Sequence, residues 1–172
     1  MSTEWLTIDQ QRAWRAYLLG TTLLMEHLDR DLRENHDLSL PEYEILVRLS
    51  ESPGRALRMA ELADSVKNSR SRITHTVARM ERSGLVVRRQ CASDGRGVVA
   101  QLTDAGHAKL VDAAPGHVRS VRDGLIDVVQ AGDIAALGRA FTAVVESLET
   151  CVPDPVLSPT SARPDQSRVN LR

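Results

Sequence analysis

The stretch 68–102 constrains the fold of this 172-residue chain more than any other. At about 100° per residue, Ile73, Val77 and Met80 fall within about 60° of one another, which is typical of a helix with one buried face. Gly84 follows at the position where a helix commonly ends in a left-handed residue. The spacing therefore predicts a two-sided helix of roughly four turns.

The opposite side of this helix is polar and basic. Asn68 or Ser69 is suited to cap its N-terminus. The outward side chains fall into a central group that points away from the apolar stripe and a flanking group. The central group is Ser71, His75, Ala78 and Arg82, and the others are Arg72, Thr74 and Arg79, with Arg70 in the first turn.

A basic hairpin is predicted directly after the helix. The hairpin runs from Val86 to Leu102 around a Ser-Asp-Gly-Arg-Gly turn, and it carries Arg88 and Arg89 before the turn. A short helix can enter the major groove of DNA while an arginine-rich hairpin contacts the neighbouring minor groove. The segment thus indicates a nucleic-acid interface.

The preceding segment supports this interpretation. Residues 59–66 have apolar side chains at helical spacing and are joined to the next helix only by Lys67 and Asn68, as in a helix-turn-helix. The small Ala60 and Ala63 would allow the two helices to approach closely. An ordinary helical hairpin in an all-α core has the same pattern, so spacing alone leaves both interpretations open.

Charge separates the two interpretations. Residues 55–100 contain ten Lys or Arg and four Asp or Glu, a local balance of +6, whereas the remainder of the chain carries −7. A solvated surface normally mixes both signs, while a phosphate-facing surface concentrates positive charge. The near-neutral total of −1 therefore conceals a basic module on an acidic frame.

The residues that carry these features resemble the MarR family of winged helix-turn-helix regulators. The matching motifs are Leu62-Ala63, the run 69–86, Asp94-Gly-Arg-Gly97 and Leu102-Thr-Asp-Ala-Gly106. With the flanking helices, the resemblance covers about residues 8–150. It implies a homodimer that binds double-stranded DNA at a palindromic operator, usually represses transcription, and often releases DNA when it binds a small anionic or phenolic effector.

The resemblance also implies roles for particular residues. Residues 69–83 resemble the family's recognition helix, and Asp94 and Arg96 match its Asp-x-Arg wing tip, in which the acid orients the arginine toward the minor groove. The middle residue, often basic in the family, is Gly95 here, which removes one possible phosphate contact. Without the family, Asp94 and Arg96 would be interpreted as a surface ion pair in a tight turn.

Helices are predicted on both sides of this module. Apolar spacing predicts one long helix over about residues 8–34, opened by a capping box from Thr7 to Gln10. A second capping box, from Ser39 to Glu42, opens a helix that runs to about Leu49. Thr103 begins a further helix through about residue 129, which we expect to bend at Pro115-Gly116.

A narrow apolar seam marks the last predicted helix. Its residues recur at alternating steps of three and four, which is a heptad pattern that requires a partner helix. The seam residues are Ile134, Leu137, Phe141, Val144 and Leu148, with Cys151 continuing the pattern. The partner helix can lie in the same chain or in a second copy, and the operator geometry that the family resemblance implies favours the second copy.

We therefore predict a mainly α fold with a small β wing, in which a winged helix-turn-helix lobe is joined to a helical dimerisation frame. The N-terminal dimerisation helix is residues 1–38, the DNA-binding lobe is 39–102, and residues 103–151 complete the frame. Residues 152–172 contain several prolines and no apolar periodicity, which predicts a disordered tail.

Four residues are candidates for an effector pocket between the first helix and the DNA-binding lobe. They combine an aromatic wall with a cation for an anionic ligand, and they are Trp14, Arg15, Tyr17 and His36. The alternative is that Trp14 and Tyr17 simply pack in the dimer core.

No enzymatic constellation is found. The five histidines lack metal-ligand spacing, and there is no phosphate loop or serine elbow, so neither catalysis, a metal nor a cofactor is predicted. Two distant cysteines and no signal peptide or long apolar run predict a cytoplasmic protein without membrane contact. Two alternatives remain: a winged-helix module that docks an acidic partner, and a redox-sensing regulator that uses Cys91 beside the arginines of the hairpin.

Overall fold

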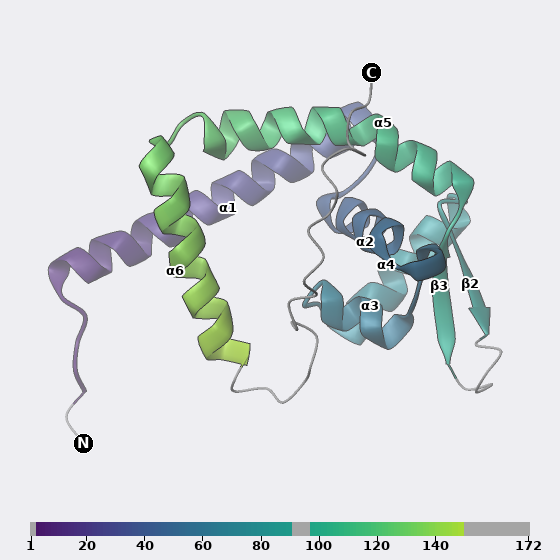
Figure 1. Cartoon of the computed structure of the whole chain (residues 1–172), viewed down its shortest axis with the longest axis horizontal. Helices are drawn as coiled ribbons and strands as arrows, with labels where there is room; N and C mark the ends of the chain where they lie inside the picture. Colours follow the sequence, from purple (N-terminus) through teal and green to yellow (C-terminus); the bar gives the residue numbers. More distant parts are fainter. Residues whose placement is uncertain (1–2, 91–96, 150–172) are drawn as a thin grey trace. The chain divides into compact units, whose positions relative to one another are not determined.

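The computed structural model describes residues 3–90 and 97–149, and the chain divides into two compact units, residues 1–134 and 135–172. The first unit holds most of the secondary structure (Figure 1). In chain order the elements are α1 (Ile8–His36), α2 (Leu40–Glu51), η1 (Pro53–Arg55), β1 (Ala56–Arg58), α3 (Met59–Ser65), α4 (Arg70–Arg82), β2 (Val86–Gln90), β3 (Val98–Leu102), α5 (Asp104–Val121), η2 (Arg122–Ile126) and α6 (Ala131–Glu149).

Both predicted capping boxes are present. At the start of α1, the backbone N–H of Thr7 donates to Gln10 Oε1 at 2.8 Å, and that of Gln10 donates to Thr7 Oγ1 at 3.2 Å. At the start of α2, the backbone N–H of Ser39 donates to Glu42 Oε2 at 2.9 Å. Because each box satisfies N–H groups that the first helical turn leaves unpaired, these short motifs determine where the helices begin.

Helices α2, α3 and α4 enclose the core of the lobe predicted over residues 39–102. The predicted stripe of α4, formed by Ile73, Val77 and Met80, is buried. It packs with apolar side chains of α2 and α3 that are also fully buried, among them Leu46 and Leu62. The prediction about small residues is half right, because Ala63 is buried whereas Ala60 is exposed.

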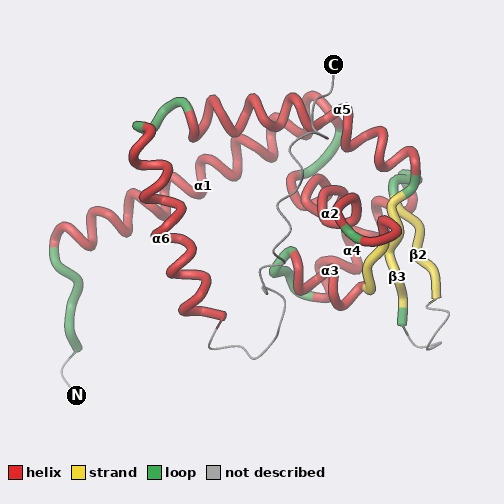
Figure 2. Tube along the Cα trace, viewed as in Figure 1, coloured by secondary structure: helices red, strands yellow, loops and turns green. Residues whose placement is uncertain are grey.

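A three-stranded antiparallel sheet completes the lobe, in the order β1-β3-β2 (yellow in Figure 2). The predicted hairpin is β2 and β3, paired from Val86 opposite Leu102 to Gln90 opposite Val98. The third strand, β1, pairs with the other edge of β3 and was not predicted. The fold class is thus the expected one, mainly helical with a small β wing.

Helix α5 runs beside α1 in the first unit (Figure 1). The packing is close at Gly116, where an added Cβ atom would lie 2.9 Å from His36 Nε2, while His36 Nδ1 lies 3.1 Å from Asp112 Oδ2. The predicted interruption at Pro115 is displaced, since α-helix continues through Pro115 and the irregular π segment η2 begins only at Arg122. Asp112 and Gly116, on either side of Pro115, both lie close to His36 of α1 along this continuous stretch of helix.

His117, on α5, lies in an unusual environment at the junction with α2. Its ring contacts that of Tyr43 at an interplanar angle of 42°, with the centroids 4.3 Å apart, and its buried Nδ1 has no hydrogen-bond partner among the described residues. Burial lowers the pKa of His117, and the negative charge of Asp31 opposes this only in part. Packing at this junction therefore favours the neutral imidazole.

Acidification is expected to destabilise the fold through His117. The pKa of His117 is lower in the folded than in the unfolded chain, so the unfolded state binds more protons as the pH falls below about 6.5. The free energy of unfolding should therefore decrease in this range, by at most about 1.4 kcal/mol per pH unit. Urea unfolding of the wild type and of His117→Phe, between about pH 5 and pH 8, measures this loss. An equally steep pH dependence in His117→Phe, which keeps an aromatic ring against Tyr43 but cannot titrate, would contradict the assignment.

Helix α6 presents an apolar seam with little burial. None of its residues is buried, and within the predicted seam Leu137 is 38% exposed, Val144 47% and Leu148 65%, while Ile134 and Phe141 are half-buried.

Within the described parts of the chain no single helix is long and apolar enough to cross a membrane, although the consecutive segments Asp104–Ile126 and Ala131–Glu149 would meet that standard together by length and composition alone.

Candidate nucleic-acid interface

Helix α4 is fixed at both ends by the residues expected to do so. Ser69 caps its N-terminus, with Oγ accepting from the backbone N–H of Arg72 at 3.3 Å, and Gly84 follows its C-terminus with φ +73°. Since Ile73, Val77 and Met80 anchor one face in the core, the other face is directed to solvent. The orientation of α4 within the lobe follows from this pattern.

Most of the predicted DNA-binding side chains lie on that solvent face or on the first wing strand. All of this group are exposed, and the arginines among them form no ion pair with any other described residue. They are Arg70, Ser71, Arg72, Thr74, His75 and Arg82 on α4 and Arg89 on β2. Unpaired guanidinium groups on a solvated surface are available to contact phosphates or base edges.

A hollow of about 400 Å³ lies where the start of α4 meets the wing. Its lining includes Arg58, Arg70, Thr74, Arg88 and Val98, which come from β1, α4, β2 and β3. Arg58 was not among the predicted residues, because β1 was not expected to lie beside the hairpin. The concave, arginine-lined surface is electrostatically suited to polyanionic ligands.

Arg88 is less available than predicted. Its Nε donates to Glu81 Oε2 at 2.8 Å, and its backbone N–H donates to Glu81 Oε1 at 2.9 Å. The hydrogen bonds from Arg88 lower the pKa of Glu81. Arg88 therefore ties the first wing strand to α4, next to the surface that the sequence predicts to contact DNA.

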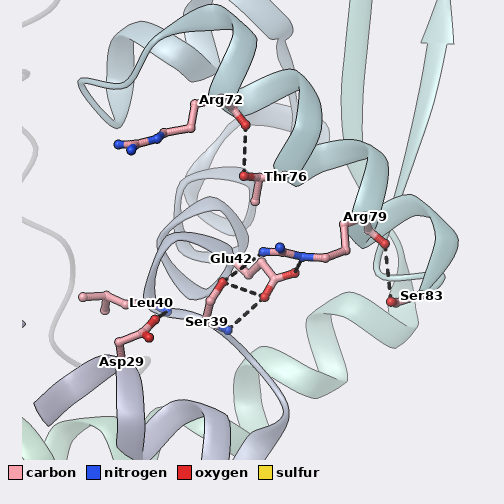
Figure 3. Close-up of polar contacts among 8 residues, drawn as sticks. All are labelled: Asp29, Ser39, Leu40, Glu42, Arg72, Thr76, Arg79 and Ser83. Carbon is pink, nitrogen blue, oxygen red and sulfur yellow. Dashed lines mark hydrogen bonds and ion pairs between the residues drawn. The ribbon is translucent and has the colours of Figure 1, made fainter. Parts of the chain in front are cut away.

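Arg79 departs further from the prediction that it points into the groove. Its Nε donates to Glu42 Oε1 at 2.8 Å, and its terminal nitrogen donates to Ser39 Oγ at 3.3 Å, so that the guanidinium lies against the start of α2 (Figure 3). Sequence reasoning identified Ser39 and Glu42 only as a helix cap. The periodicity of α4 cannot reveal a partner 37 residues earlier in the chain.

Three predicted residues cannot be placed. Asp94 and Arg96 at the wing tip, and Cys91 beside them, lie outside the described residues. In the part of the chain that the structure describes, no group of three or more His, Cys, Asp or Glu side chains could hold a metal ion.

The predicted effector residues do not form a single site within one chain. Trp14 and Tyr17 are adjacent, with ring centroids 5.7 Å apart, and both are exposed on α1. Arg15 is exposed on the same stretch, but His36 ends the same helix about six turns away, roughly 33 Å along its axis, and is bonded to Asp112. A straight helix cannot bring its two ends to one small ligand.

Comparison with known proteins decides the family. The sequence model of the MarR family matches residues 38–98, and Sco3205, a MarR family transcriptional regulator from Streptomyces coelicolor solved in complex with DNA, is 44% identical to this chain. The structures agree with a TM-score of 0.82 over 86% of this chain and 92% of Sco3205. The chain belongs to the MarR family.

Two further relatives support the MarR assignment. AbsC, a MarR family regulator also from Streptomyces coelicolor, is 42% identical with a TM-score of 0.81 over 86% of this chain and 99% of AbsC. The transcriptional regulator HosA from Escherichia coli is 30% identical over 93 residues, which are 54% of this chain and 67% of HosA. This MarR protein is therefore a DNA-binding transcriptional regulator rather than an enzyme.

Proposed function

We propose that the protein is a homodimeric, sequence-specific regulator that binds a twofold-symmetric operator, represses transcription from it and leaves it when a small effector binds. The observation that carries the proposal is the solvent face of α4, where exposed basic and polar side chains stand beside the wing. Selection of bound duplexes from a random pool with purified protein tests it, and the expected result is a consensus with twofold symmetry.

In this proposal the contacts divide between two kinds of readout. Ser71, Thr74 and His75 face base edges in the major groove, and the flexible arginines of α4 and β2 neutralise phosphates. Asp94 and Arg96 would extend the contact into the minor groove. The similarity to Sco3205, which was solved in complex with DNA, supports DNA binding by this chain.

Dimerisation is supported by apolar surface that a lone chain leaves in water. Helix α1 exposes large side chains, including Trp14 at 51%, Leu19 at 62% and Leu23 at 55%, and the α6 seam adds Leu137 and Leu148. Soluble monomers rarely expose so many apolar groups on neighbouring turns. A second copy of the chain would cover these faces and hold two α4 helices about 34 Å apart, one turn of DNA.

A cavity of about 440 Å³ offers a site for the effector in the first unit. It lies between α1, α2, the end of α3 and α5, and its lining includes Met25, Leu28, Tyr43, Val47 and His117. Pockets of this size accept small aromatic ligands. We therefore propose that the effector binds in this cavity. Val47→Trp would fill the cavity, so a compound that weakens operator binding by the wild type but not by this variant would identify the effector class.

Arg89 and His75 are expected to affect DNA binding differently. Arg89→Ala removes a phosphate contact, so affinity should fall about equally on the selected and on random duplexes, and the slope of log affinity against log salt should decrease by about one. His75→Ala should weaken only the selected duplex, by about 1–3 kcal/mol. Fluorescence anisotropy titrations at several salt concentrations measure both.

Arg12→Ala is the matched charge control, since Arg12 is exposed near the start of α1 and forms an ion pair with neighbouring Asp9. Its salt slope should equal that of the wild type. If the wild type and His75→Ala instead both bound every duplex with equal affinity, the protein would be a docking module for acidic partners and not an operator-binding regulator.

A further inference from the structure

A buried carboxylate joins α4 to the start of α2. Glu42 accepts three hydrogen bonds, from the backbone N–H of Ser39 at 2.9 Å, from Ser39 Oγ at 2.7 Å and from Arg79 Nε at 2.8 Å. Arg79 also donates to Ser39 Oγ at 3.3 Å, which closes the cluster. Figure 3 shows the three side chains converging between the two helices.

The two ends of this ion pair differ in burial. The Glu42 side chain is 11% exposed, whereas that of Arg79 is 52% exposed. Burial alone would raise the pKa of Glu42, but the hydrogen bonds from Arg79 and Ser39 outweigh it and leave the pKa lowered. Glu42 is therefore ionised, and removal of Arg79 would leave a charged, largely buried group with only Ser39 as its partner.

The same turn is also tied to α1. The backbone N–H of Leu40 donates to Asp29 Oδ1 at 2.8 Å, and the other carboxylate oxygen of Asp29 accepts from Arg33 Nε at 2.6 Å. Asp29 and Arg33 belong to α1, the helix that carries the exposed apolar surface. Asp29 of α1 and Arg79 of α4 thus both bond to the start of α2, at the adjacent residues Leu40 and Ser39 (Figure 3).

From this geometry we infer that Arg79 is a positioning residue: Glu42 and Ser39 hold it so that α4 presents its solvent face to DNA at a fixed rotation, and Arg79 itself does not read a base. The inference rests on the proposed DNA-binding function and deepens it.

A small rotation of α4 is enough to matter. At a side-chain radius of about 5–6 Å, a turn of about 20° about the helix axis moves a side-chain tip by about 2 Å. Hydrogen bonds to base edges do not survive such a displacement. Because Ser71, His75 and Arg82 all share the face opposite the core, an unlatched α4 would misplace them together.

The decisive test compares both partners on the duplex selected from the random pool. Glu42→Gln and Arg79→Gln are each expected to weaken binding about tenfold, and the double variant should be no weaker than either single variant, because all three remove the same ion pair. If Arg79 read a base instead, Glu42→Gln should bind DNA as tightly as the wild type or more tightly, because the guanidinium group of Arg79 would be freed. Unchanged or tighter binding by Glu42→Gln overturns the inference.

Two further readouts separate positioning from a general loss of stability. A scan of single base-pair changes in the selected duplex should show that Arg79→Gln loses discrimination at every position read by α4, not at one, while its salt slope stays that of the wild type. Arg79→Lys, which can still reach Glu42, should recover part of the affinity. Loss at one base position only, or no recovery with lysine, would also contradict the inference.

Glu34→Gln provides the matched control, because Glu34 is an exposed carboxylate near the end of α1 and lies outside the cluster. It should bind as the wild type does, and circular dichroism with thermal unfolding should show every variant folded at the assay temperature. If the wild type itself prefers no duplex, the proposed function fails; if the wild type binds its duplex and both Gln variants bind equally well, only the inference fails.

Discussion

Replacing Leu137 and Val144 by glutamate should make the protein monomeric and weaken operator binding about a thousandfold, because each lobe would then bind its half-site alone. Both side chains lie in the α6 seam and are about 40–50% exposed in the single chain, so the charges need not disturb its core. In a dimer they would be buried against a partner helix, where an unpaired carboxylate is strongly unfavourable. Sedimentation velocity and anisotropy titration measure the two effects.

The control places the same charges on the opposite side of α6. Ala135 and Thr142 are both exposed and lie roughly 140–160° around the helix from Leu137, so Ala135→Glu combined with Thr142→Glu adds equal charge away from the seam. This variant should remain dimeric and bind the operator. If the Leu137 and Val144 variant also stayed dimeric with unchanged affinity, α6 would not contribute to the dimer interface.

Gly106→Ala should lower the free energy of unfolding by about 2–4 kcal/mol. Gly106 is buried in the first turn of α5, its N–H donates to Thr103 Oγ1 at 2.9 Å, and an added Cβ would overlap the carbonyl oxygen of Leu85. That carbonyl already accepts from Thr103, so neither backbone can move away without breaking the junction between wing and α5. Urea unfolding monitored by circular dichroism measures the loss.

Gly138→Ala is the comparison for this prediction. Gly138 lies inside α6 with nothing within 4 Å of the position that a Cβ would occupy, so alanine should be neutral or stabilise the helix by up to about 1 kcal/mol. Equal effects of the two substitutions on the free energy of unfolding would mean that contact with the Leu85 carbonyl does not destabilise Gly106→Ala.

Local signals explain why much of the lobe could be predicted. The bounds of α4 depend on an apolar stripe, the Ser69 cap and Gly84, all of which act over a few residues. The capping boxes of α1 and α2 and the β2–β3 hairpin are equally local. Each of these features is a contact between near neighbours in sequence, which periodicity and turn chemistry encode directly.

Contacts distant in sequence explain what was missed. Strand β1 has only three residues, too few for an alternation pattern, and forms because β3 offers a free edge more than 40 residues later. Arg79 was placed correctly on α4, but its side chain turns to Glu42, a partner that only the packing of α2 on α4 brings near. The predicted effector residues were chosen for their chemistry, which does not show that Trp14 and His36 lie about 33 Å apart along α1.

The spacing between half-sites tests the central claim most directly, namely that two lobes are held at one fixed separation. Affinity should be measured for the selected operator and for the same operator with about five base pairs inserted at its centre, which turns one half-site to the opposite face of the DNA. The account predicts that the insertion reduces affinity about a thousandfold, to the level of a single half-site. An insertion that leaves affinity unchanged would contradict it.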